Sequence, residues 1–83
     1  MGGALVKSSV NLARGSVGAS AIVSWTASPN HTYQVEIANS IRATKWQTLT
    51  IQSNNGGDPV IMQITESISP AAGPRFYRVR ELP

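Results

Sequence analysis

Apolar and polar residues alternate along most of the chain, which is the pattern of β-strands with one buried face. In the clearest case Ala21, Val23 and Trp25 share one face, and the residues between them share the other. The same period of two predicts strands over residues 4–11, 21–27, 32–38, 46–52, 59–66 and 75–82. No segment has a convincing helical period, although residues 39–45 have room for one helical turn. We therefore expect an all-β chain of about six strands.

Turn-forming residues separate these runs. Pro29 fixes the backbone after the second strand, and Asn30 tolerates left-handed geometry. Residues 53–58, with two asparagines and two glycines, give the strongest hairpin signal of the chain. Further turns are expected near residues 15–18 and in the proline-containing segment 69–74, which would join two sheets. Turn residues at these positions favour short connections and antiparallel pairing of the strands.

The length of 83 residues predicts a single domain, residues 1–83, with residues 1–3 as a flexible or partner-bound N-terminus. A chain this short buries only about 60% of its unfolded surface. Because it has no cysteine, disulfides add nothing, and assembly with copies of itself or with a larger partner is the other common source of stability. The inward positions expected to form the structural core are Val23, Trp25, Tyr33, Val35, Ile37, Leu49, Met62, Ile64, Tyr77 and Val79.

Charged residues make up only 13% of the chain, against a typical value of about 25%. Much of the surface must then be Ser, Thr, Asn and Gln, as on extracellular and virion proteins. The net charge of +3 is too small to argue for nucleic acid by itself. Residues 1–7 lack the pattern of an export signal, and no apolar run approaches the roughly 20 residues of a bilayer span. We expect a virion or extracellular location, within a larger protein or assembly and without membrane insertion.

Catalytic chemistry has little support in the residues. His31 is the only histidine, and the acids are scattered over different elements, at Glu36, Asp58, Glu66 and Glu81. A Ser-His-Asp arrangement would have no nucleophile elbow, and one histidine without thiols does not supply a transition-metal site. We therefore expect no enzyme activity, no metal and no cofactor.

Three short motifs, in their order and spacing, resemble fibronectin type III-like and immunoglobulin-like β-sandwich modules. The motifs are Val23-Ser24-Trp25, Tyr33-Gln34-Val35 and Tyr77-Arg78-Val79-Arg80. The likeness is to the small modules that recur near the ends of large secreted bacterial proteins. It implies a small antiparallel two-sheet β-sandwich that binds or builds, with Trp25 buried in its core.

The chain departs from the resembled pattern at its C-terminus. It ends just after the strand that holds Tyr77, where a full domain would turn back into a final strand. Either residues 4–14 fill that place, so that the two termini pair within one sheet, or the sandwich keeps an open edge. An open edge favours β-augmentation, in which the strand of residues 75–82 or 4–11 pairs with a partner protein or a second copy.

The basic residues are densest at the last strand, in Arg75, Arg78 and Arg80. Alternation puts Arg78 and Arg80 on the outer face, and the resembled fold places this strand beside Glu36. Cross-strand Glu–Arg pairs of about 0.2–1 kcal/mol explain these arginines without a ligand. Weak nucleic-acid binding, with Phe76 as a stacking surface, is a third choice.

Trp46 leaves two interpretations open. It either packs in the core against Leu49 and Ile51, or forms a platform on which sugar rings stack. The second interpretation makes the chain a carbohydrate-binding accessory module of a secreted bacterial enzyme. The function that we predict ahead of carbohydrate binding is that of a structural, protein-binding building block of a virion, capsid decoration or adhesive assembly. Its candidate interaction residues are Glu36, Trp46, Phe76, Arg78 and Arg80.

Overall fold

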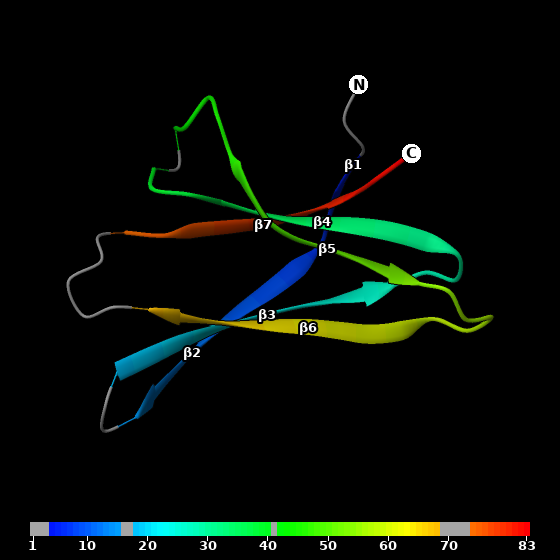
Figure 1. Ribbon diagram of the computed structural model, residues 1–83, viewed down its shortest axis with the longest axis horizontal. Helices are drawn as coiled ribbons and strands as arrows, with labels where there is room; N and C mark the ends of the chain where they lie inside the picture. The colour runs from blue at the N-terminus through cyan, green and yellow to red at the C-terminus, as the bar shows by residue number, and fades with distance from the viewer. Residues whose placement is uncertain (1–3, 16–17, 41, 69–73) are drawn as a thin grey trace.

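The computed structural model describes residues 4–15, 18–40, 42–68 and 74–83 (Figure 1), without the side chains of residues 14 and 15. Within these ranges the chain forms strands and no helix, so the expected all-β class is confirmed. The strands are β1 (Ala4–Val6), β2 (Ser8–Gly15), β3 (Gly18–Ala27), β4 (His31–Ala38), β5 (Gln47–Asn54), β6 (Val60–Ile68) and β7 (Phe76–Glu81). The expectations for residues 1–3, for the turn at 16–17 and for the loop 69–73 lie outside the described residues.

The strands make two antiparallel sheets, which confirms the expected two-sheet β-sandwich. The first, sheet A, has the order β1-β7-β4-β5, and the second, sheet B, has the order β2-β3-β6. Figure 1 shows the two layers, with β2 and β3 running away from β7 at one end of the molecule. A search of the described residues for a helix long and apolar enough to cross a membrane finds none.

The first expected strand divides in two at Lys7, which is why the structure has seven strands where the sequence predicts about six. Before Lys7 the chain belongs to sheet A, where Ala4 lies opposite Glu81 and Val6 opposite Val79. After Lys7 it belongs to sheet B, where Ser8 lies opposite Trp25. The two termini therefore pair within one sheet, but over three residues only.

The core lies between the sheets. Among the ten expected core residues, six are buried, namely Val23, Trp25, Tyr33, Val35, Ile37 and Val79. The other four, Leu49, Met62, Ile64 and Tyr77, are half-buried and pack against that cluster. The rings of Trp25 and Tyr33 meet at a centroid distance of 6.1 Å and an angle of 52°. The buried core residues thus come from β3, β4 and β7, and half-buried residues, mostly from edge strands, pack around them.

The turns have the expected backbone chemistry at two places. Asn30 adopts the left-handed conformation, with φ of 59°. The β5–β6 turn is organised by the buried side chain of Asn54, which donates from Nδ2 to the carbonyl oxygens of Ala27 at 3.1 Å and Asp58 at 2.9 Å. Its Oδ1 accepts from the Gly56 amide at 3.0 Å. Asn54 therefore holds the hairpin connection onto the end of β3.

The connection between β4 and β5, for which the sequence allows a helical turn, contains no helix in its described part. In its described part, residues 39–40 and 42–46, the chain makes bends and one hydrogen-bonded turn, with the Ala43 amide donating to the Ser40 carbonyl at 3.1 Å.

Candidate functional site

The candidate site lies on the outer face of sheet A, where β4 and β7 run side by side. The register places Gln34 opposite Arg80 and Glu36 opposite Arg78. The structure thereby confirms that the last strand neighbours the strand of Glu36. We call this group, with two side chains near the start of β5, the outer-face cluster; its members are Gln34, Glu36, Trp46, Thr48, Arg78 and Arg80.

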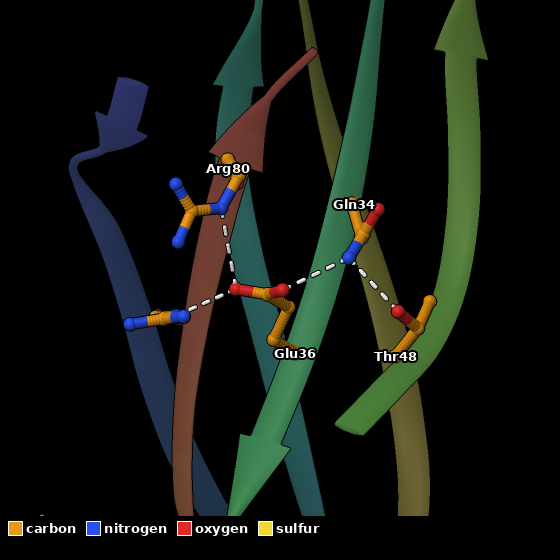
Figure 2. A network of polar contacts seen from close by, with 5 residues as sticks. Gln34, Glu36, Thr48 and Arg80 are labelled. Atoms are coloured by element: carbon orange, nitrogen blue, oxygen red, sulfur yellow. Dashed lines mark hydrogen bonds and ion pairs between the residues drawn. The ribbon is translucent and has the colours of Figure 1, made fainter. Parts of the chain in front are cut away.

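Glu36 is the centre of the cluster (Figure 2). Its Oε1 accepts from Nε of Arg78 at 2.6 Å and from Nε of Arg80 at 3.4 Å. Its Oε2 accepts from Nε2 of Gln34 at 2.9 Å, and the same amide donates to the Thr48 hydroxyl at 2.8 Å. Glu36 points outward as expected, yet only 6% of it is exposed, because these hydrogen-bonded side chains surround the carboxylate. The accessible part of this face is therefore its arginines and not its acid.

The charges of the cluster keep Glu36 ionised. Burial by itself would raise the pKa of this carboxyl group. The hydrogen bond and positive charge of Arg78, with a smaller contribution from Arg80, outweigh burial and lower the pKa below its usual value. Two guanidinium groups then face one carboxylate, so the cluster as a whole carries an excess of positive charge.

Trp46 joins this cluster from the end of the β4–β5 connection, immediately before β5. It is half-buried, and the guanidinium carbon of Arg78 lies 4.2 Å from the centre of its ring. Of the two residues against which Trp46 was expected to pack, Leu49 packs against the core and Ile51 is 55% exposed. Arg78 therefore lies between Glu36 and the face of Trp46, where a cation–π contact adds to the ion pair.

The three arginines predicted as one basic cluster divide between the two faces of sheet A. Arg75 lies just before β7 and binds Glu66 of β6, with 3.1 Å between Nη1 and Oε1. The Tyr77 hydroxyl donates to the same Oε1 at 2.5 Å. Burial, followed by this hydrogen bond, raises the pKa of Tyr77 to about 12. Phe76, the remaining candidate, is half-buried at the start of β7, opposite Ala38.

Another group of polar side chains lies where β4 begins and β7 ends. The Tyr33 hydroxyl accepts from the Ser28 amide at 2.7 Å and donates to Oε1 of Glu81 at 3.3 Å. His31 is exposed, with Nδ1 2.7 Å from the Pro29 carbonyl oxygen and Nε2 3.9 Å from Glu81. Nowhere in the described part of the chain do three or more His, Cys, Asp or Glu side chains gather as a metal site would require.

Sequence reasoning missed Asn54 and the group of Glu66, Arg75 and Tyr77 as structural sites. Each depends on contacts between different strands, since Asn54 binds the end of β3 and Glu66 of β6 binds residues at the start of β7. The one signal in the sequence is Glu66, a charged residue on an inward face. Comparison of the chain with protein-family models, with curated protein sequences and with solved structures finds no match. A function must therefore be argued from the residues and the fold.

Proposed function

We propose that this chain is a non-catalytic β-sandwich module, similar to fibronectin type III and immunoglobulin-like domains, that builds or decorates a larger protein assembly. The setting we propose is a virion or a cell-surface or secreted protein. The module would bind its neighbours through its strand edges and through the outer face of sheet A.

The observation that carries the proposal is the character of the edge strands. Among the described residues, β2 and β6 end sheet B and β5 ends sheet A, and these strands have eight, nine and eight residues. Proteins protect such edges with charges, prolines or short strands. Here β5 has no charged residue, β6 has only Glu66 and β2 only Arg14. Long edges with so little protection suit the addition of further strands.

Exposed apolar side chains support the same interpretation. The large hydrophobic residues that stay exposed in the described structure are Leu5, Val10, Leu12, Ile51, Val60 and Ile61. All of them lie on strands at a sheet edge, namely β1, β2, β5 and β6. Apolar residues gathered at edges favour association with other proteins.

The two other candidate functions receive less support from the outer-face cluster. Arg78 already covers one face of the Trp46 ring, which leaves less aromatic surface for a sugar. Both Arg78 and Arg80 bind Glu36, so part of the positive charge that a nucleic acid would need is compensated. We therefore rank carbohydrate binding second and nucleic-acid binding third.

Sedimentation equilibrium of the full chain over a range of concentrations, combined with hydrogen exchange, tests the proposal. We expect the mean mass to rise with concentration, or the edge amides to exchange rapidly until a partner protein is added. A chain that stays monomeric and still protects the edge amides of β2, β5 and β6 would contradict it. The genes next to this one would separate the two settings, because virion genes and genes of secreted enzymes have different neighbours.

A further inference from the structure

We infer that the sandwich has a vacant strand position beside β7, and that an extended segment of a partner protein fills it. The inference rests on the proposed function, since it adds to the edge strands a further place, beside β7, at which the module would bind. It is carried by three features that meet at one place, namely an unpaired length of β7, exposed inward-facing residues on β2, and an apolar groove between them.

The first feature is the edge of β7. On one side this strand pairs with β4 over six residues, from Phe76 to Glu81. On the other side β1 covers only residues 79–81, because the chain leaves sheet A at Lys7. In the described chain, no other strand is hydrogen-bonded to β7 on that side. A strand edge without a partner can pair with a strand of another chain.

The second feature is the inner face of β2. Val10 lies opposite Val23 and Leu12 opposite Ala21, so their side chains share the inward face of sheet B. Val23 and Ala21 are completely buried, whereas Val10 is 43% and Leu12 62% exposed. The difference arises because sheet A, in its described part, has no strand beyond the short β1 to cover β2. Figure 1 shows β2 continuing away from β7 there.

The third feature is the groove itself. It has a volume of about 360 Å³ and is lined by Val10, Leu12, Ile68, Arg75 and Tyr77. Three of these five residues, Val10, Leu12 and Ile68, are aliphatic, so the groove would accept an apolar side chain of an added strand.

The register of β1 predicts the chemistry of the added strand. Val6, opposite Val79, faces inward, and Leu5, opposite Arg80, faces outward. We consider an added strand that continues β1 along β7 in the same register. Its residue opposite Tyr77 would face inward onto the groove, and its residue opposite Arg78 would face outward beside the guanidinium groups. The partner segment is therefore acidic at one position, apolar at the next, and apolar again two residues later.

A synthetic peptide tests this assignment directly. The probe alternates valine with threonine and carries one glutamate immediately before the first valine; a control peptide has proline in place of that valine. We expect the probe to bind the full chain and to slow hydrogen exchange of the amides in residues 76–78. The control peptide should bind at least about tenfold more weakly, because proline cannot donate a hydrogen bond and does not fit a ladder.

Two variants of the chain locate the binding site. Leu12→Glu places a charge in the groove and should weaken binding of the probe by about tenfold or more. Ile61→Glu is the matched control, since Ile61 is 78% exposed on β6 and lies outside the groove. Circular dichroism of both variants establishes that they fold, which their exposed positions favour. Exchange data on the unmodified chain remain decisive if Leu12→Glu does not fold.

The outcomes separate this inference from the proposed function. Protection at the edges of β5 or β6, or equal binding to Leu12→Glu and the unmodified chain, would overturn the vacant position beside β7 and leave the proposed function standing. Protection of residues 76–78 that grows with protein concentration alone would assign the position to a second copy and overturn the partner segment. Failure of the probe to bind overturns the inference, and the sedimentation experiment then decides the proposed function separately.

Discussion

Glu36 and Arg78 lie opposite each other on β4 and β7, with 2.6 Å between Oε1 and Nε. The same guanidinium group lies over the ring of Trp46. Arg78 therefore links the acid at the centre of sheet A to the aromatic residue that enters β5. Because the carboxylate is almost fully buried, its removal leaves two guanidinium groups close together without their shared counterion.

Replacing Glu36 by glutamine should destabilise the fold. Hydrogen bonds to charged groups contribute about 1.5–3 kcal/mol, so we expect a loss of about 2 kcal/mol in the free energy of unfolding. Urea denaturation at neutral pH measures it. Asp58→Asn is the control, because Asp58 is an exposed acid in the β5–β6 turn. Equal stability of the two variants would show that the ion pairs of Glu36 contribute nothing.

The lowered pKa of Glu36 predicts how stability changes with pH. The folded-state pKa lies below the unfolded value of about 4.3, so the stabilisation is complete above that value. It is lost as the pH falls through the lower folded-state pKa. The difference in stability between the unmodified chain and Glu36→Gln should therefore shrink in acid. A difference that stays constant from neutral pH into strong acid would contradict this account.

The raised pKa of Tyr77 predicts that stability falls at alkaline pH. Its pKa is raised from 10.0 to about 12 in the folded chain, first by burial and then by the hydrogen bond to Glu66. The stabilisation is complete below the unfolded value of about 10 and is lost as the pH rises through about 12. Thermal unfolding of Tyr77→Phe should therefore depend less on pH in this range than unfolding of the unmodified chain. Identical alkaline profiles would contradict the prediction.

Asn54 should be the most sensitive residue of the β5–β6 turn. Asn54→Ala removes hydrogen bonds to Ala27, Asp58 and Gly56, and we expect a loss of about 2 kcal/mol in the free energy of unfolding. Asn55, its exposed neighbour, provides the matched control, because Asn55→Ala should change stability by about 0.5 kcal/mol or less. Urea denaturation of the pair measures both effects, and similar losses in the two variants would argue against an anchoring role for Asn54.

Trp46→Ala tests the contact with Arg78 and the carbohydrate alternative together. Loss of the cation–π contact should lower the free energy of unfolding by about 1 kcal/mol. Retention of the chain on immobilised polysaccharides should not change, because the proposed module binds proteins. Retention by the unmodified chain that disappears in Trp46→Ala would favour the carbohydrate-binding function instead.

The local pattern was enough to predict the faces of the central strands. Alternation predicts that Trp25, Tyr33 and Val79 face inward, and all three are buried. The same period put Glu36 and Arg78 outward, and the structure joins them across neighbouring strands. These predictions succeed because a strand has a period of two residues, which depends on the chain nearby and not on its distant partners.

Pairing and burial at the margins were decided only by the tertiary structure. The sequence around Lys7 reads as one strand, yet the chain changes sheets there because β7 and β3 offer separate partners. Alternation puts Arg75 and Arg78 on opposite faces, but only the fold decides that Glu66 binds the first and Glu36 the second. The sequence by itself thus determined the all-β class and the inward faces of the central strands. The tertiary structure alone decided which edges remain unpaired, because an edge depends on which distant segments compete to cover it.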